Sequence, residues 1–315
     1  MPKETIKGRN ICMKSSINGM AEEFRSQLDK PGAVELPGCY DVLSAMILEE
    51  AGFNAVFLSG YGVAASMLGN PDIGLTSLSE TVAAAKSVVN ALKIPIVVDI
   101  DNGYGNEDNV LRVIHELEYS GVAGVIMEDQ IMPKRCGHSG NKQVIPIEQY
   151  MSKLECALKS RQTPMMIVAR TDSMDLSEAI SRAKMFHGAG ADVTLIDGLS
   201  SLDAIKRVAD EVPGHKQINL IYGGKTPLLS VKELAKLGFK VVLYSTPALY
   251  AATRTLLESM RKLRESHDIN SISNESLPFK DFQEFIERKY SERNARKLER
   301  SNHKSANAPS VAAIR

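Results

Sequence analysis

The sequence predicts one closed (β/α)8 barrel followed by an extra helix. Along its 315 residues, eight short apolar runs each end in a polar or charged residue and give way to an amphipathic segment. Strict alternation of this kind is typical of parallel strands joined by helices. A doubly wound open sheet is the alternative. It is disfavoured because no run is followed by the Gly-x-Gly-x-x-Gly turn of dinucleotide-binding folds.

The expected strands are near-continuous apolar runs rather than alternating ones, as in parallel strands that are covered on both faces. They lie at residues 33–36, 55–59, 94–99, 124–128, 165–169, 193–197, 217–221 and 241–244. Between them, apolar residues recur at helical spacing, as in residues 78–89. Ser77 and Ser230, each followed three residues later by Glu, predict capping boxes at helix starts. Left-handed glycines are expected where helices end before even-numbered strands, at Gly52, Gly121, Gly190 and Gly238.

A further helix is expected before the first strand. Met20, Phe24 and Leu28 have helical spacing and predict a short helix that caps the N-terminal end of the barrel. We therefore expect the catalytic barrel and its cap to span residues 1–265.

The pattern changes after the barrel. A polar linker leads into a helix whose apolar face carries Phe279, Phe282, Phe285 and Ile286, within an extension over residues 266–300. This face needs a partner outside the barrel, on the same subunit or on a neighbour. Residues 301–315 are rich in Ser, Ala and Asn and predict a disordered tail.

Composition excludes several classes of function. The formal net charge is zero, which disfavours binding to nucleic acid or to an anionic membrane. No apolar stretch approaches the roughly 20 residues of a membrane span. The four cysteines show no metal-binding spacing, which indicates reduced thiols in a cytoplasmic protein. The partner expected from these features is a small molecule.

Polar side chains at the strand ends predict a chemical site, because catalytic groups of such barrels lie at the C-terminal ends of the strands. The strand ends carry Ser59, Gly60, Tyr61, Asp99, Asp101, Glu128, Arg170, Asp197, Asn219 and Tyr244. The sharpest pair is Asp99 and Asp101, whose carboxylates should face the same way if both lie on one strand. Hard oxygen ligands of this kind favour Mg²⁺ or Mn²⁺. The alternative is that they cap the helix beginning near Asn106 or pair with a lysine.

Cys136 is the candidate thiol. It follows Lys134 and Arg135 and precedes Gly137 and His138, and neighbouring positive charge favours a reactive thiolate. A lone cysteine is more often a small buried hydrophobe, but charged residues and glycine surround this one. His138 by itself could equally cap a helix or lie in a solvated loop.

Two further segments could bind anions. The Gly-rich turn from Ser59 to Gly62 offers successive backbone N–H groups, although most such glycines only make a turn. Arg170 suits bidentate carboxylate binding, and the alternative is an ion pair with Glu128 or Asp197. Gly223 to Pro227 lacks the spacing of a phosphate loop and indicates a tight turn.

From about Pro37 to about Met260 the chain resembles the isocitrate lyase/phosphoenolpyruvate mutase superfamily. The resemblance rests on five segments: Ser59 to Asp72, Asp99 to Asn106, Glu128 to Gln130, Pro133 to His138 and Ala169 to Asp172. The Lys-Arg-Cys-Gly-His run is similar to the lyase branch, which includes methylisocitrate lyase, dimethylmalate lyase and oxaloacetate hydrolase or petal-death-like proteins. It is also similar to carboxyphosphonoenolpyruvate phosphonomutase, a mutase that keeps the cysteine.

The resemblance implies roles for individual residues. Mg²⁺ would be held by Asp99, Asp101, Glu128 and Asp72. Substrate would be bound by Ser59, Gly60, Tyr61, Gly137, His138, Arg170, Asn219 and Tyr222. The catalytic set would be Cys136, as acid/base on a gating loop, with Lys134, His138 and Arg170. The family also implies a homotetramer in which C-terminal helices swap between subunits.

Three positions depart from the family pattern. Asn102 stands where Thr or Ala is usual, Asp197 where Glu is usual, and Tyr222 where the lyases carry Glu. The expected activity is Mg²⁺-dependent C–C bond cleavage in a 2-hydroxy- or 2-oxo-dicarboxylate, with a di- or tricarboxylate or a phosphonate as the substrate class. The alternatives are a phosphonomutase that forms a P–C bond and, less favoured, a barrel that binds a metabolite without turnover.

Overall fold

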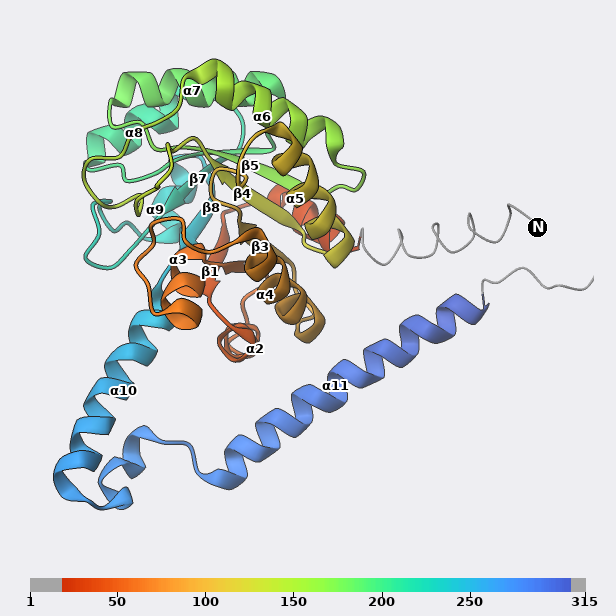
Figure 1. The fold of residues 1–315 in the computed structure, drawn as a ribbon, viewed down its shortest axis with the longest axis vertical. Helices are drawn as coiled ribbons and strands as arrows, with labels where there is room; N and C mark the ends of the chain where they lie inside the picture. Colours follow the sequence, from red (N-terminus) through yellow and green to blue (C-terminus); the bar gives the residue numbers. More distant parts are fainter. Residues whose placement is uncertain (1–18, 307–315) are drawn as a thin grey trace, which may run out of the picture. The chain divides into compact units, whose positions relative to one another are not determined.

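The computed structural model describes residues 19–306. Its centre is a closed barrel of eight parallel strands in the order β1 to β8, which confirms the predicted (β/α)8 fold (Figure 1). The strands are β1 (Val34–Cys39), β2 (Val56–Leu58), β3 (Ile96–Asp99), β4 (Gly124–Glu128), β5 (Met166–Thr171), β6 (Val193–Ile196), β7 (Lys216–Asn219) and β8 (Phe239–Tyr244). All eight coincide with predicted runs, and β4 has the predicted bounds.

Helices surround the barrel. They are α2 (Val42–Glu50), α3 (Gly60–Val63), α4 (Leu78–Ala91), α5 (Glu107–Ser120), α6 (Ile147–Ser160), α7 (Leu176–Ala189), α8 (Leu202–Glu211) and α9 (Val231–Lys236). A π-helical turn, η1 (Ala64–Leu68), continues α3. Both predicted capping boxes are present, at Ser77 of α4 and Ser230 of α9. The four predicted glycines have φ angles of +92°, +84°, +103° and +87°, in the left-handed region.

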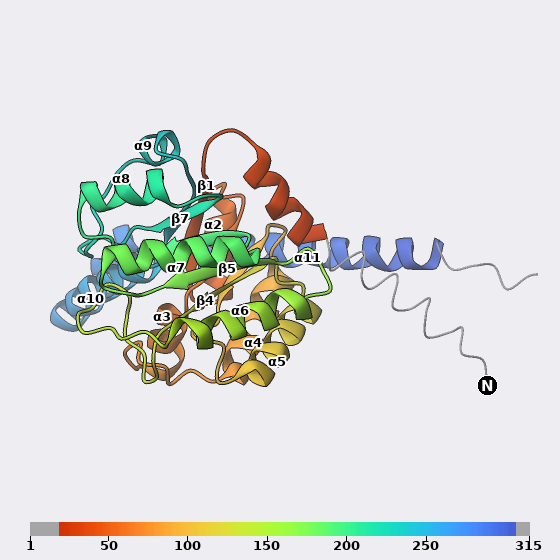
Figure 2. The same ribbon diagram turned by 90° about the horizontal axis from the view of Figure 1, so that it is seen from above.

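The barrel interior is filled by side chains. Phe57, Ile126 and Leu243 belong to one buried cluster with other inward-facing strand residues. Phe24 and Leu28, from a helix over residues 19–29, join the same cluster. Gln27 of this helix donates from Nε2 to the carbonyl of Asn54, 3.0 Å away and just before β2, so the helix lies at the N-terminal ends of the strands (Figure 2). The opposite end of the barrel is left for the site.

The described chain divides into two compact units, the first spanning Asn18–Ala251 and the second beginning at Ala252. Helix α10 (Pro247–Ser266) crosses this boundary. The 3-10 helix η2 (Ile269–Glu275) and helix α11 (Phe279–Ala306) follow. Helix α11 thus continues past residue 301, and residues 307–315 of the expected tail lie outside the described residues. Within residues 19–306, no helix is long and apolar enough to cross a membrane.

Candidate active site

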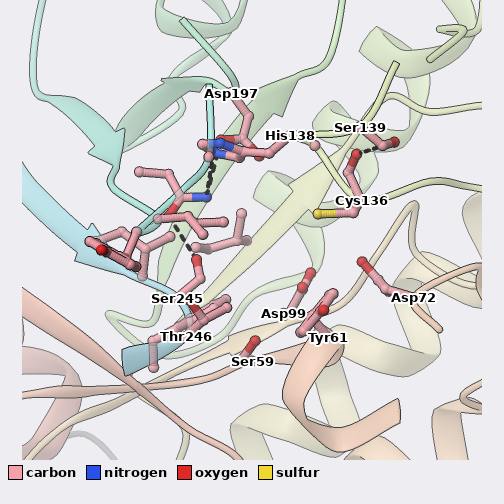
Figure 3. Close-up of a pocket in the computed structure, with 18 of the residues that line it drawn as sticks. Ser59, Tyr61, Asp72, Asp99, Cys136, His138, Ser139, Asp197, Ser245 and Thr246 are labelled. Carbon is pink, nitrogen blue, oxygen red and sulfur yellow. Dashed lines mark hydrogen bonds and ion pairs between the residues drawn. The ribbon is translucent and has the colours of Figure 1, made fainter. Parts of the chain in front are cut away.

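A cavity of about 310 Å³ lies at the C-terminal ends of the strands (Figure 3). Ten of the fourteen residues proposed from the sequence line it: Ser59, Tyr61, Asp72, Asp99, Cys136, Gly137, His138, Arg170, Asn219 and Tyr222. Tyr222 lies at the rim, where its side chain is 85% exposed. Phe57, Ile126, Ile221 and Leu243 supply apolar lining. The cavity therefore combines a charged side with an apolar floor.

Asp99 and Asp101, at the end of the third strand and just beyond it, have different surroundings. Asp99 is the last residue of β3 and lines the cavity. Asp101 lies beyond the strand, has a left-handed φ of +47°, and donates its backbone N–H to Oδ1 of Asp99 at 3.2 Å. Its carboxylate accepts from the Lys134 ammonium instead. The strand ends before the second aspartate, so the alternation of side chains on which the predicted shared direction is based does not extend to Asp101. The helix-capping alternative is wrong, since Asn106 itself caps α5.

Lys134 lies among four carboxylates, those of Asp72, Asp99, Asp101 and Glu128, which together form the acidic cluster. Its side chain is fully buried, and Nζ lies 3.1 Å from Oδ1 of Asp72 and 3.9 Å from Oε1 of Glu128, in addition to the bond with Asp101. Burial opposes the charge of Lys134, but these carboxylates together with Asp99 outweigh it and hold the pKa of Lys134 well above its usual value. The lysine pairing considered for the aspartate pair is therefore present for Asp101.

Cys136 lines the cavity, away from the Lys134 ammonium in its sequence neighbourhood. Burial, followed by the charges of Asp197 and Asp72, raises the pKa of Cys136 despite the His138 backbone N–H and Arg170. The Lys134 ammonium, which the sequence places two residues from the thiol, is instead bonded within the acidic cluster, and a reactive thiolate at Cys136 stays a prediction. The raised pKa favours the thiol form, which can act as a proton donor.

Arg170 connects the two sides of the site. It contacts Asp172 at 2.8 Å, Asp197 at 2.9 Å and Glu128 at 3.3 Å. Burial of the guanidinium is outweighed by these carboxylates, which raise the pKa of Arg170. Lys142 shares Asp172 at 2.8 Å. The ion-pair alternative for Arg170 is therefore what the structure shows, and any carboxylate binding by Arg170 would share the guanidinium with these three acids.

Residues beside Cys136 fit closely over Asp197. His138 Nε2 lies 3.4 Å from Oδ1 of Asp197, and Asn219 donates to the same oxygen at 3.1 Å. Burial is outweighed by Arg170 and His138, which hold the pKa of Asp197 well below its usual range. A Cβ at Gly137 would lie 1.9 Å from Oδ2 of Asp197, so only glycine fits there. Asp197 is thus in contact with the loop that carries Cys136.

The turn after β2 forms the opposite wall. Ser59 caps the short α3 by accepting from the N–H of Gly62 at 3.2 Å. Gly60 does not line the cavity itself, but a Cβ there would lie 2.9 Å from Oδ2 of Asp99, so glycine brings this turn against the acid. The rings of Tyr61 and Tyr250 meet edge to face with centroids 6.3 Å apart. The hydrogen bond to Tyr250, followed by burial, raises the pKa of Tyr61 to about 12.

The sequence reasoning missed the wall after β8. Ser245, Thr246 and Tyr250 line the cavity, and Ser245 donates to Oδ1 of Asn219 at 2.7 Å. Tyr244, chosen as the polar end of this strand, points the other way: its hydroxyl lies 3.2 Å from Oε2 of Glu35 and its ring packs outside the barrel. Because side chains alternate along a strand, the hydroxyl residue directly after Tyr244 was the available signal.

The acidic cluster fits a divalent cation by its donor chemistry. Both carboxylate oxygens of Glu128 are buried without a hydrogen-bond partner, and burial raises the pKa of both Glu128 and Asp99. Such groups gain from a nearby cation, and hard carboxylate oxygens suit Mg²⁺. Lys134 supplies one positive charge within the cluster. With Lys134 there, no three acidic, histidine or cysteine side chains among residues 19–306 form a ready metal-binding group.

Comparisons with known proteins identify the family of this chain. The family model for phosphoenolpyruvate phosphomutase matches residues 24–264. The 2,3-dimethylmalate lyase of Eubacterium barkeri is 35% identical over 84% of this chain and 93% of its own length. The chloroplastic carboxyvinyl-carboxyphosphonate phosphorylmutase of Arabidopsis thaliana is 37% identical over 84% of this chain and 80% of its own length.

Solved structures are similar as well. Oxaloacetate acetylhydrolase in complex with 3,3-difluorooxalacetate superposes with a TM-score of 0.81 at 27% identity, covering 93% of this chain and 99% of that one. Phosphonopyruvate hydrolase in complex with oxalate and Mg²⁺ superposes with a TM-score of 0.77 at 25% identity, covering 89% of this chain and 98% of that one.

Proposed function

Because this chain belongs to the phosphoenolpyruvate mutase/isocitrate lyase superfamily, whose members are lyases and phosphonomutases, we propose that it is a Mg²⁺-dependent carbon–carbon lyase. Its substrate would be a 2-hydroxy- or 2-oxo-dicarboxylate of the dimethylmalate, methylisocitrate or oxaloacetate type. The observation that carries this proposal is one cavity lined by the thiol side chain of Cys136 on one side and by Asp99 on the other.

The acidic cluster would hold the cation. Its ligands, directly or through water, would be Asp99, Asp101, Glu128 and Asp72. When bound, Mg²⁺ would supply Lewis-acid stabilisation of negative charge that develops on the substrate. The backbone N–H groups of the turn at Gly60 and Tyr61 would orient a substrate carboxylate, and Arg170 would add positive charge beside it.

Cys136 would complete the reaction as general acid. As the proton of the substrate's 2-hydroxyl group passes to solvent, that oxygen forms the carbonyl of the departing oxo-acid, and the electron pair of the broken C–C bond stays on carbon in the carboxylate fragment. A 2-oxo substrate would first add water at C2, and the fragment that then leaves is a carboxylic acid. The S–H proton of Cys136 moves to the carbon that keeps the electron pair, and the thiolate regains a proton from solvent before the next turnover. The raised pKa of Cys136 supports this direction, because it keeps the proton available at neutral pH. The apolar floor at Phe57 and Ile126 would keep water from the carbanion.

Phosphonomutase activity is the second candidate. The phosphorylmutase relative is 37% identical to this chain, as similar as the lyase relative at 35%. Tyr222 at the cavity rim, where the family's lyases carry Glu, removes one negative charge from the neighbourhood of an anionic substrate. That change would suit a phosphonate at least as well as a dicarboxylate.

A substrate panel separates the two activities. Dimethylmalate, methylisocitrate, oxaloacetate, phosphonopyruvate and carboxyphosphonoenolpyruvate would each be incubated with enzyme and Mg²⁺ and followed by ¹H and ³¹P NMR. A lyase releases an oxo-acid or another carboxylate from a carbon substrate, and chelation of the metal stops the release. A change confined to the phosphorus substrates would reject the lyase proposal in favour of the mutase. No reaction with any substrate would contradict both.

We also propose a homotetramer with exchanged C-terminal helices. Leu256, Leu257 and Met260 of α10 are 60%, 53% and 47% exposed, and Phe279 of α11 is 84% exposed. Apolar faces of this kind are costly in water unless a partner covers them. Light scattering would give about four times the 34.4 kDa chain mass, and a monomer would contradict the proposal.

A further inference from the structure

The segment that carries Cys136 is held on its outer side by the turn after β7. The backbone N–H of Lys225 donates to Nδ1 of His138 at 3.0 Å. The ammonium of Lys225 donates to the backbone carbonyl of Ser139 at 2.6 Å. One residue therefore makes two bonds to the two residues that come directly after the Cys136-Gly137 pair.

Lys225 stands outside the chemistry proposed for the cavity. Its side chain is exposed, and it does not line the cavity that holds Cys136 and Arg170. Its contacts with His138 and Ser139 therefore act on the loop rather than on the substrate.

The segment fits against glycines. A Cβ at Gly224 would lie 2.5 Å from Nδ1 of His138, and a Cβ at Gly198 would lie 2.8 Å from the carbonyl oxygen of Gly137. Gly137 itself admits no side chain because of Asp197. Contacts this close allow the segment only one packed position against the barrel, which we call its seating, since side chains at these glycine positions would push it outward.

The bond to Nδ1 also orients the imidazole. Because Nδ1 of His138 accepts from Lys225, the ring hydrogen of the neutral imidazole is on Nε2, which faces Oδ1 of Asp197 at 3.4 Å. The backbone N–H of His138 in turn interacts with Cys136, lowering its pKa against the larger effect of burial. A shift of His138 would therefore also change the hydrogen bond that its backbone N–H makes with the Cys136 thiol.

We propose that Lys225 is a positioning residue that holds the Cys136 segment closed over the cavity. Its side chain tethers the carbonyl of Ser139, and its backbone sets the orientation of His138. The consequence for catalysis rests on the proposed function, because only a reaction that uses Cys136 depends on this seating. The effect of Lys225 on the position of the loop does not depend on the proposed function.

Alkylation of Cys136 tests the seating without any substrate. The intact protein would be treated with iodoacetamide and the rate at each cysteine measured by peptide mass spectrometry, with half-buried Cys156 and buried Cys39 as internal references. Lys225→Met should raise the Cys136 rate about threefold to fivefold, as expected for loss of one exposed charge-assisted hydrogen bond. Lys225→Arg keeps a cationic donor and should restore a rate near that of the unaltered protein.

Lys232→Met is the matched control, because it removes the same charge from exposed surface of the neighbouring α9. It should leave the Cys136 rate unchanged. An unchanged rate in Lys225→Met, an equal rise in Lys232→Met, or a rise at all cysteines together would overturn the proposal. Gly224→Ala, which displaces His138, should raise the Cys136 rate as well, and a rate no higher than that of the unaltered protein would count against the seating.

Kinetics with whichever substrate the panel identifies provide the second readout. Lys225→Met should lower kcat by about threefold to fivefold, with a smaller change in KM, because an open segment carries the proton donor away from a substrate bound elsewhere in the cavity. A change in KM alone would argue against a positioning role. If no substrate reacts, the proposed function fails, while the alkylation rates still decide the seating of the segment.

Discussion

The ammonium of Lys134 lies 3.1 Å from Oδ1 of Asp72, within the acidic cluster, although Lys134 is only two residues from the thiol at the cavity. One loop therefore supplies a cation to the proposed metal cluster and a proton donor to the proposed substrate cavity. Residues that are close together in this loop therefore contribute to different parts of the site. Its chemistry can be tested one residue at a time.

Removal of the buried cation should destabilise the metal-free protein. Lys134→Met leaves Asp101 and its neighbouring carboxylates without this partner, and loss of one member of a buried ion pair costs about 3–5 kcal/mol. Thermal unfolding would show a lowered Tm that Mg²⁺ restores more strongly in the variant than in the unaltered protein. Lys159→Met, which breaks an exposed pair with Glu155, is the control and should change Tm little. If Mg²⁺ raised the Tm of Lys134→Met no more than that of Lys159→Met, the idea that Lys134 and Mg²⁺ share the acidic cluster would be contradicted.

Loss of the thiol should abolish proton transfer but not folding. Cys136→Ser replaces the proton donor by a hydroxyl of much higher pKa, and turnover should fall by about 10²-fold or more. Circular dichroism and Tm should be unchanged, since Cys136 lies at a cavity surface rather than in the core. Cys156→Ser provides the matched change outside the cavity and should keep full turnover. Normal activity of Cys136→Ser would remove Cys136 from the mechanism.

The pH dependence of alkylation should report the raised pKa of Cys136. Only the thiolate reacts, so the rate rises as pH rises through the pKa, and a raised pKa moves this rise to higher pH. The rate should still be increasing above pH 9, the usual value for a cysteine. Glutathione in the same buffers gives the reference curve for an unperturbed thiol. A plateau near pH 7 would mean that the thiolate is the resting form.

Glu128 should contribute directly to divalent-cation affinity. Its two oxygens are buried without hydrogen bonds, and their ion pairs with Arg170 and Lys134 are 3.3 and 3.9 Å long, so Glu128→Gln removes charge that a bound cation would use. Calorimetric titration with Mg²⁺, or Mn²⁺ binding followed by electron paramagnetic resonance, should show affinity weakened by about tenfold or more. Glu107→Gln, at the half-buried first residue of α5, is the control. Unaltered affinity in Glu128→Gln would place the cation elsewhere.

The barrel was predictable because its signals are local. Each strand is a continuous apolar run, and the capping boxes at Ser77 and Ser230 are formed by residues three positions apart. The left-handed Gly121 ends α5 through bonds to Glu118 and Leu117 within the same helix. Interactions that span so few residues produce a recognisable spacing in the sequence, so periodicity and spacing are enough to identify them.

The site was predictable in its membership and not in its orientations. Asp99 and Arg170 were expected at the mouth because strand ends meet there, and both line the cavity. The direction of Asp101 depends on one backbone angle just past the strand, where alternation no longer applies. Tyr244 and Ser245 are neighbours, and only the register of β8 decides that the second one faces the cavity.

By itself the sequence therefore determined the (β/α)8 barrel, its strands, its helix ends and the family to which it belongs. Only the tertiary structure decided that Lys134 is buried among carboxylates, that Cys136 lines the cavity, and that Lys225 touches the loop from 86 residues away. The physical reason is that loops have no repeating pattern. Their conformation is set by charges and close contacts contributed from distant segments, which meet only once the barrel has closed.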